Sequence, residues 1–450
     1  MTQVLRQVDD LRQVTARVID GSPAEQTEVI LTESDSSLTR FANSEIHQNV
    51  AEHGVSVRVR VVADGRVGVA STNQVDDASL KEVLARAVES ARHQPRRDDV
   101  PPLAPPAEVA PAAVDEATAT AGPRERAALV AEICGRADSR SVKAFGAIST
   151  GVTRYVVANS RGLFMQTPRA MATATVVAMA EGGKGYGDRA SGRLADLDAA
   201  GAGDEAIDRA LRTRDAEPIE PGVYPTVLQE SAVASLLEYS AYIGFSALAV
   251  EEGRTFMRPG ERITGENIHV WDDGHDPRGL PMPFDFEGVP RRRVDLISAG
   301  VATGLVHDLS SAARAGVAST GHGLPAPNPY GAYATNLFMA GGEAESVDAL
   351  CEGIERGVWV TRFWYVNVVH PRQGSLTGMS REGTFLIENG RVTRPIKDMR
   401  FTQSVPEALG TVTAMTRDLK LEVGEDYDYS AAYVVPAIRV EKFNWTSVTR

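Results

Sequence analysis

The chain has 450 residues, of which 43% are hydrophobic and 24% charged. This is the composition of a folded globular protein and excludes global disorder. The 47 basic and 60 acidic residues give a formal net charge of −13, and because phosphate repels an acidic surface without a basic patch, we expect no nucleic-acid partner.

The first 220 residues predict helices packed on an antiparallel sheet. Valines alternate with polar residues at 54–62, which is typical of a half-buried strand, and Asp64-Gly65 predicts a hairpin turn. Helices are expected over the opening segment (with Val4, Leu5, Val8, Leu11 and Val14 on one face), 77–92, 124–137 and 197–212, and strands over 28–31, 54–62, 67–70 and 144–180.

Residues 94–123 are rich in proline, which favours an extended surface connector. An acidic stretch with prolines at 215–221 predicts the main domain boundary. We therefore expect an N-terminal α+β domain over 1–220, which includes the connector, and a C-terminal domain over 221–450.

The second half predicts many strands and few helices. Strands are expected at 223–228, 358–369, 384–387 and 432–440, a long apolar helix at 230–249, a helix at 343–356, and an irregular polar segment at 261–293. Because helices do not separate the strands one by one, a doubly wound Rossmann sheet is disfavoured. The predicted class is α+β with two domains, an N-terminal antiparallel sheet with helices and a strand-rich C-terminal domain.

Two observations indicate the compartment. Cys134 and Cys351, the only cysteines, are too few for a disulfide framework and recur with apolar residues at helical spacing, so each is expected to be buried. The first 20 residues lack the apolar core of a signal peptide, and the longest weakly polar stretch, 241–250, is too short to span a membrane. We expect a cytoplasmic protein without a membrane partner.

The familiar catalytic motifs are missing from the sequence. None of the eight histidines is followed by Glu, and the closest pairs, 47/53 and 269/275, are six residues apart, so no His-Glu zinc helix is predicted. A nucleophile elbow and a Walker lysine are also absent, and Gly183-Lys184-Gly185 and Gly321-His322-Gly323 are predicted as loops. One alternative stays open, a free-standing metal-dependent hydrolase with a loop site at His269 and His275.

The second half resembles the TldD/TldE (PmbA) family, and more closely its TldE branch, which lacks the zinc-binding motif. The clearest matching segment contains Thr377-Gly378-Met379 and Phe385-Leu386-Ile387-Glu388-Asn389-Gly390. Further matching segments are 236–257, 304–309, 319–322 and 334–338. The resemblance implies a subunit of a heteromeric cytoplasmic metalloprotease.

In that family the TldD partner carries His-Glu, three residues and His on a helix, with a later Cys as third zinc ligand. The corresponding helix here, 237–245, has no His but Leu, Tyr, Ile and Phe, which predicts a packing surface, and no Cys follows Cys351. We therefore assign no catalytic residue, no metal ligand and no cofactor to this chain, and expect zinc in a TldD-like partner.

The predicted role is a non-catalytic subunit that shapes the cavity in which unfolded or precursor peptides are cleaved. Its expected partners are a TldD-like metalloprotease subunit and a peptide, and the chain alone is compatible with a homodimer. His322, Asn336 and His370 lie in or near the matched segments and are predicted to line the peptide cavity. A non-proteolytic interaction module is the second alternative.

Segment 358–369 is a candidate sheet edge for main-chain pairing with an extended peptide, with Trp359, Phe363 and Trp364 as apolar contacts. The competing interpretation is that these three aromatic side chains fill the core.

Overall fold

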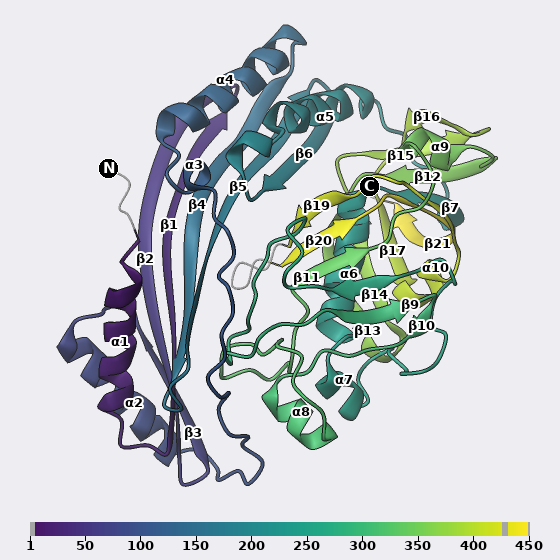
Figure 1. Cartoon of the computed structure of the whole chain (residues 1–450). Helices are drawn as coiled ribbons and strands as arrows, with labels where there is room; N and C mark the ends of the chain where they lie inside the picture. Colours follow the sequence, from purple (N-terminus) through teal and green to yellow (C-terminus); the bar gives the residue numbers. More distant parts are fainter. Residues whose placement is uncertain (1–4, 425–430, 449–450) are drawn as a thin grey trace.

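The computed structural model describes residues 5–424 and 431–448, and its strands form three sheets (Figure 1). The first is antiparallel, in the order β3-β2-β1-β4-β5-β6, and is the long curved sheet of Figure 1. Its strands are β1 (Gln26–Ala42), β2 (Glu45–Ala63), β3 (Arg66–Thr72), β4 (Lys143–Asn159), β5 (Phe164–Ala180) and β6 (Gly183–Ser191).

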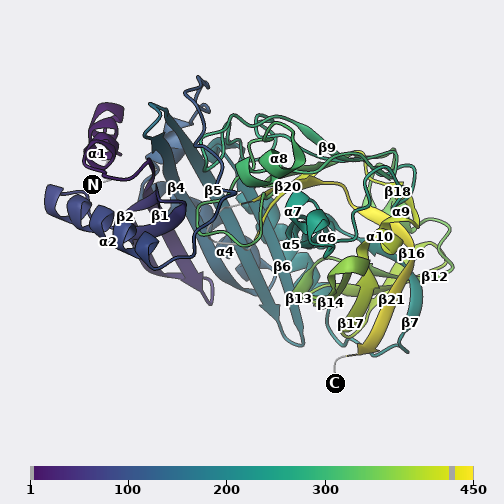
Figure 2. The same cartoon turned by 90° about the horizontal axis from the view of Figure 1, so that it is seen from below.

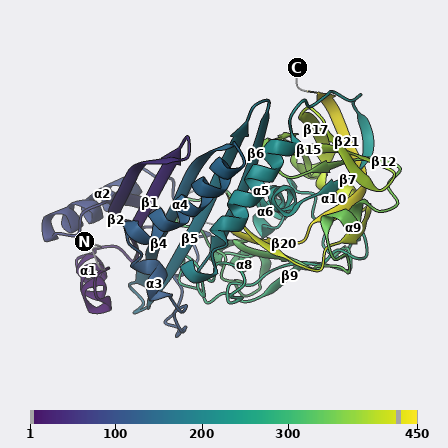
Figure 3. The ribbon, with the colours of Figure 1, turned by 90° about the horizontal axis from the view of Figure 1, so that it is seen from above.

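Helices cover one face of this sheet, and the second half of the chain packs on the other. The helices are α1 (Val8–Asp20), α2 (Asp77–Arg92), α3 (Glu116–Ala119), α4 (Pro123–Ser139) and α5 (Ala199–Arg212). Figure 3 shows α4 and α5 lying across the sheet, and Figure 2 shows α1 and α2 at the opposite end of the molecule from strands β7, β17 and β21. Because neighbouring residues of a strand face opposite ways, Val29 and Leu31 pack toward helices while Ile30 packs against Phe284 and Phe286.

Local signals predicted several of these elements. The Asp64-Gly65 hairpin is confirmed, with positive φ at both residues as a tight two-residue turn requires. The helix at 77–92 is confirmed with the predicted bounds. Asp76 fixes its start by accepting hydrogen bonds from the N–H groups of Ala78 and Ser79. The first helix begins only at Val8, after Leu5, and Val4 lies outside the described residues.

The prediction of a loop at Gly183-Lys184-Gly185 was wrong, because these residues begin β6. A Cβ on Gly183, Gly185 or Gly187 would lie only 2.0–2.2 Å from a backbone carbonyl oxygen of α5. Glycine at alternate positions therefore lets α5 pack directly on this strand.

Two further sheets form the second half. A six-stranded sheet has the order β10-β9-β8-β11-β20-β19, and a nine-stranded sheet runs β13-β14-β17-β21-β7-β12-β15-β16, with β18 paired to β21. The strands are β7 (Gly222–Leu228), β8 (Val270–Asp272), β9 (Val294–Ser298), β10 (Val301–Ala302), β11 (Asn336–Met339), β12 (Arg356–Val360), β13 (Phe363–His370), β14 (Ser375–Ser380), β15 (Thr384–Glu388), β16 (Arg391–Pro395), β17 (Met399–Ser404), β18 (Val412–Met415), β19 (Lys420–Val423), β20 (Ala432–Val435) and β21 (Ile438–Val448).

The helices of the second half are mostly short. They are α6 (Glu230–Ile243), α7 (Ala247–Glu251), α8 (Leu309–Ala315), α9 (Val347–Cys351) and α10 (Val405–Leu409). The longest, α6, contacts β7 and β13 of one sheet and β19 and β20 of the other, so it lies between the two sheets. The largest apolar core of the described residues forms around it.

The predicted continuous helix over 230–249 was wrong, because α6 ends at Ile243 and α7 starts at Ala247. The Phe245 carbonyl accepts a hydrogen bond from Val306 N–H, and Ala247 N–H donates one to the Val306 carbonyl. Pairing with a neighbouring segment therefore replaces helical hydrogen bonds at this point, and the sequence period does not reveal it.

Three other predicted boundaries in the second half were wrong. The helix at 343–356 is only Val347–Cys351, and the strand at 358–369 is divided between β12 and β13. The strand at 432–440 is divided between β20 and β21 by Pro436, which has no N–H for a ladder. The connector at 94–123 has no regular secondary structure apart from the short helix α3 and Pro123, which begins α4. It does not lie wholly on the surface as predicted, because Leu103 and Ala104 are buried.

The α+β class and the antiparallel first sheet are confirmed, whereas the domain boundary at 220 stays a prediction. Cys134 and Cys351 are buried as expected, and burial raises the pKa of the Cys351 thiol to about 12. Among the residues described, no helix is both long and apolar enough to cross a membrane.

Candidate functional site

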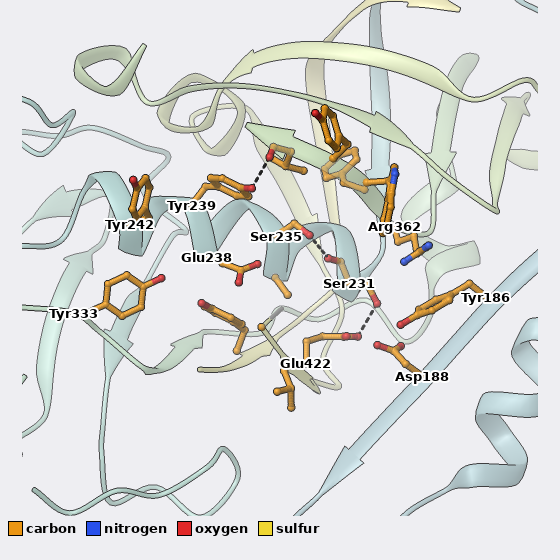
Figure 4. Close-up of a pocket in the computed structure, with 18 residues that line it drawn as sticks. Tyr186, Asp188, Ser231, Ser235, Glu238, Tyr239, Tyr242, Tyr333, Arg362 and Glu422 are labelled. Atoms are coloured by element: carbon orange, nitrogen blue, oxygen red, sulfur yellow. Dashed lines mark hydrogen bonds between the residues drawn. The ribbon is translucent and has the colours of Figure 1, made fainter. Parts of the chain in front are cut away.

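A cavity of about 350 Å³ lies beside α6 and is lined by β6, β13 and β19 together with that helix (Figure 4). The lining residues of α6 are three or four positions apart, so they share one face of the helix. They are Ser231, Ala234, Ser235, Glu238, Tyr239 and Tyr242. Strands from both halves of the chain complete the wall, so the cavity exists only in the folded whole.

The two faces of α6 differ sharply. Leu236, Leu237 and Ala241 are at most 2% exposed and belong to the apolar core, whereas Glu238 and Tyr239 are half-buried in the cavity wall. The prediction that this helix forms an apolar packing surface is therefore correct for one face and wrong for the other, which is polar.

A buried ionic cluster forms the wall where the halves meet. Lys420 Nζ lies 2.9 Å from Asp188 Oδ1 on β6 and 2.7 Å from Glu422 Oε1 on β19. Ser231 Oγ of α6 donates a hydrogen bond of 2.8 Å to Glu422. The cluster therefore joins the first sheet, α6 and β19, and it fixes two carboxyl groups at the cavity surface.

The charges of the cluster shift one another's ionisation. Burial is the largest influence on Asp188 and opposes its charged form, but the attraction and hydrogen bond of Lys420 offset it and lower the pKa of Asp188. For Glu422, burial and the repulsion of Asp188 raise the pKa to about 8. One of the two carboxyl groups is thus ionised and the other is protonated near neutral pH.

The strand β13 forms the wall opposite this cluster. Tyr239 Oη donates a hydrogen bond of 2.5 Å to the Val366 carbonyl. The Arg362 guanidinium carbon lies 3.9 Å from the Tyr186 ring centroid and 5.5 Å from that of Trp364, and Glu382 holds the same guanidinium through hydrogen bonds of 2.6 and 3.0 Å.

Aromatic side chains surround the mouth of the cavity. Tyr242, Trp364 and Tyr365 line it and are 42%, 37% and 71% exposed. Tyr330 packs against Tyr242 with ring centroids 5.5 Å apart. Exposed aromatic residues at the mouth of a polar cavity are typical of a binding surface.

The lining residues do not fit a zinc ion. Protein zinc sites are built from thiolates, imidazoles and carboxylates, and the described residues of this cavity wall include neither His nor Cys. The carboxyl groups of Asp188 and Glu422 already contact the Lys420 ammonium, which competes with any metal cation. Over residues 5–424 and 431–448, no three His, Cys, Asp or Glu side chains are grouped so that they could hold a metal ion.

Two of the predicted cavity residues lie together elsewhere, in a buried network around Asp272. His322 is 0% exposed, with Nε2 2.8 Å from Asp272 Oδ1, and Asn336 N–H donates a 2.8 Å hydrogen bond to Asp272 Oδ2. Burial would raise the pKa of Asp272, but His322 and then Arg291 lower it below its usual value. This network ties β8 to β11 and to the loop at 320–323.

None of the three predicted residues lines the cavity beside α6. His322 and Asn336 are buried and hydrogen-bonded within the protein, and His370 is exposed at the end of β13. A role for them in peptide binding stays a prediction. The two histidines of the alternative loop metal site make different contacts. His269 Nδ1 accepts a hydrogen bond from Ala299 N–H, and His275 Nε2 contacts the Arg291 carbonyl.

The predicted sheet edge is confirmed for β13 only, which ends the nine-stranded sheet, whereas β12 is an inner strand. Trp359 and Phe363 are 8% and 5% exposed and fill the core, as the competing interpretation expected. Trp364 is the exposed member of the three. Glu238, Tyr239 and Tyr242 were not predicted as cavity residues, although their spacing in an apolar helix was a usable signal.

Comparison with known proteins identifies the family. The PmbA/TldA metallopeptidase C-terminal domain matches residues 221–447, domain 1 of the same family matches 27–91, and its central domain matches 108–214. The structure is similar to that of TldE from Thermococcus kodakarensis, with a TM-score of 0.83 over 98% of this chain and 99% of that one. At 20% identity this similarity shows the shared fold.

Curated relatives support the assignment over part of their length. A metalloprotease TldD homolog from Haemophilus influenzae is 27% identical over 49% of this chain and 46% of the relative. Metalloprotease PmbA from Escherichia coli O157:H7 is 24% identical over 36% of this chain and 33% of the relative. The matches thus span half or less of these curated relatives. The resemblance predicted from the sequence is confirmed, and the chain belongs to the PmbA/TldD family of metallopeptidases.

Proposed function

We propose that this chain is the non-catalytic, TldE-like subunit of a heteromeric cytoplasmic metalloprotease that cleaves unfolded or precursor peptides. The observation that carries the proposal is the cavity-facing side of α6, which presents Ser231, Ser235, Glu238, Tyr239 and Tyr242. A TldD-like partner would supply the zinc ion, and this chain would supply a wall of the peptide cavity.

The chemistry of these side chains supports binding rather than hydrolysis. A hydrolytic zinc ion lowers the pKa of a bound water and polarises the carbonyl under attack, and the donor set beside α6 does not fit that ion. Hydroxyl, phenol and carboxyl groups can instead hold a peptide by hydrogen bonds, with the exposed aromatic residues around the mouth as apolar contacts.

The edge strand β13 supports the peptide part of the proposal. Residues 363–366 of this strand line the cavity, and among the strands of residues 5–424 and 431–448, β13 pairs on one side only, with β14. An extended peptide could pair with the other edge through main-chain hydrogen bonds, which would favour unfolded substrates of varied sequence.

The test is to mix the purified chain with a TldD-like metalloprotease and to follow cleavage of an unfolded, fluorescence-quenched peptide. We expect no cleavage by this chain alone and a clear gain in rate on mixing. A matched control replaces the partner's His-Glu motif, which should abolish the gain.

The other outcomes distinguish the alternatives. Turnover by the isolated chain with stoichiometric metal would support a free-standing hydrolase. No complex and no gain with TldD-like partners would support a non-proteolytic interaction module. A mass measurement on the isolated chain in solution shows whether it forms a homodimer before it meets its partner.

A further inference from the structure

We propose that the cavity beside α6 selects a cationic side chain, lysine or arginine, of the bound peptide. This inference rests on the proposed function and specifies its substrate class. Three observations carry it, namely the aromatic wall, the position of the Glu238 carboxyl group and the size of the cavity.

Aromatic residues of α6, β6, β13 and β20 and of the segment before β11 line the cavity. They are Tyr186, Tyr239, Tyr242, Tyr333, Phe363, Trp364, Tyr365 and Tyr433. The negative face of an aromatic ring attracts a cation, most strongly where water is partly excluded. The chain itself shows this on one wall, where the Arg362 guanidinium stacks over Tyr186 and Trp364.

The lining residues are also predominantly acidic. Asp188, Glu238 and Glu422 carry carboxyl groups, and Arg362 is the single basic residue among those that line the cavity. The Arg362 charge is balanced by Glu382, which contacts it at 2.6 Å. Lys420 balances Asp188, and Glu422 is protonated near neutral pH because its pKa is about 8, so Glu238 is the carboxyl group that a positive side chain meets in the cavity.

Glu238 is the residue best placed to receive that charge. It lies at the centre of the cavity face of α6, one turn from both Ser235 and Tyr242, and Figure 4 shows it pointing from the helix into the space between Tyr333 and Glu422. A carboxylate flanked by aromatic rings is the combination that binds alkylammonium and guanidinium groups well.

The volume limits the ligand to a small group. About 350 Å³ is at the lower end of the range for ligand pockets, which suits one long side chain of a peptide and its local backbone. An anionic side chain would be repelled by the Glu238 carboxylate, and a neutral side chain of equal length would keep only its apolar contacts.

The isolated full-length chain can test this directly by calorimetric titration. The probes are unstructured peptides that are identical except for one central residue, which is lysine, N-acetyl-lysine, norleucine or glutamate. We expect the lysine peptide to bind about 10-fold more tightly than the norleucine or acetylated peptide, a difference of about 1.4 kcal/mol, and the glutamate peptide to bind most weakly.

The variant Glu238→Gln keeps the shape of the side chain and removes its charge. We expect it to fold, which a thermal melt checks, and to reduce the preference for lysine to about 2-fold or less, that is by about 1 kcal/mol. The matched control Glu266→Gln changes an exposed carboxyl group outside the cavity lining and should leave the preference intact.

Equal affinities for the lysine and norleucine peptides, undetectable binding of the lysine peptide, or an unchanged preference in Glu238→Gln would overturn the inference. Failure of the proposed function is a separate result, because it is the absence of any gain in cleavage on mixing with a TldD-like partner. A mixture that cleaves the lysine and norleucine peptides equally well would keep that function and refute cation selection.

Discussion

Removing the Lys420 ammonium is the sharpest test of the charges inside the cavity wall. Lys420→Met keeps a long side chain but leaves Asp188 and Glu422 without the cation that lies 2.9 and 2.7 Å from them. Removing one partner of a buried ion pair costs about 3–5 kcal/mol. Because Glu422, with its pKa raised to about 8, can keep a proton, we expect the cost to lie near the lower value, about 3 kcal/mol.

The cost should depend on pH in a defined direction. Without Lys420, burial and mutual repulsion oppose the charged form of both carboxyl groups, and we expect the pKa of each to lie above its unfolded value. A group whose pKa is raised in the folded state stabilises it at low pH and loses that effect as the pH rises through the folded pKa. The destabilisation by Lys420→Met should therefore be small near about pH 5 and large near about pH 8.

Urea denaturation at a series of pH values, followed by tryptophan fluorescence, measures this cost. Lys81→Met, which alters an exposed lysine of α2, is the matched control and should change little. The triple variant Asp188→Asn, Lys420→Met, Glu422→Gln removes every charge of the cluster and should recover part of the loss. A cost below about 1 kcal/mol that is the same at all pH values would show that Lys420 does not hold the two carboxyl groups together.

Three other predictions concern single contacts. The raised pKa of Glu422 implies that the stability of the fold falls as the pH rises through about 8. Glu422→Gln should make the stability from urea denaturation depend less on pH in this range. An unchanged pH dependence would contradict the raised pKa of Glu422. Gly185→Ala would place its Cβ 2.0 Å from the Ala206 carbonyl oxygen and should lower the stability of the fold by about 3 kcal/mol or more. The control Gly135→Ala, in α4 with open space around it, should raise the stability by up to about 1 kcal/mol. Equal shifts of the two variants in a thermal melt would refute the packing argument. Tyr239→Phe removes the hydrogen bond to β13 and should cost about 1 kcal/mol in the same melt, so a neutral result would mean that this contact is not formed in solution.

The elements that the sequence predicted well carry their signals locally. The Asp64-Gly65 turn and the helix capped by Asp76 depend on neighbouring residues only, and both have the predicted bounds or geometry. The strand β6 and the interruption after Ile243 depend instead on packing against α5 and on hydrogen bonds with Val306, which lie outside the segments themselves. Patterns of one segment cannot contain that information.

The cavity likewise has one part that the sequence indicated and one part that it did not. The spacing of Ser231, Ser235, Glu238 and Tyr242 was visible in the sequence as a polar stripe on an apolar helix. The pairing of Asp188 with Lys420 joins residues 232 positions apart, and nothing in either segment indicates it. His322 was predicted to line the peptide cavity because it is a polar residue in a matched segment. In the structure it is buried and belongs to the internal hydrogen-bond network around Asp272.

Zinc retention by the isolated chain is the most direct test of its non-catalytic role. The purified protein would be incubated with zinc, dialysed, analysed for metal and assayed on an unfolded peptide, beside a TldD-like metalloprotease treated identically. We predict that this chain retains no stoichiometric zinc and cleaves nothing, while the TldD-like protein retains the metal. Tight stoichiometric zinc in this chain together with peptide cleavage would contradict the proposal.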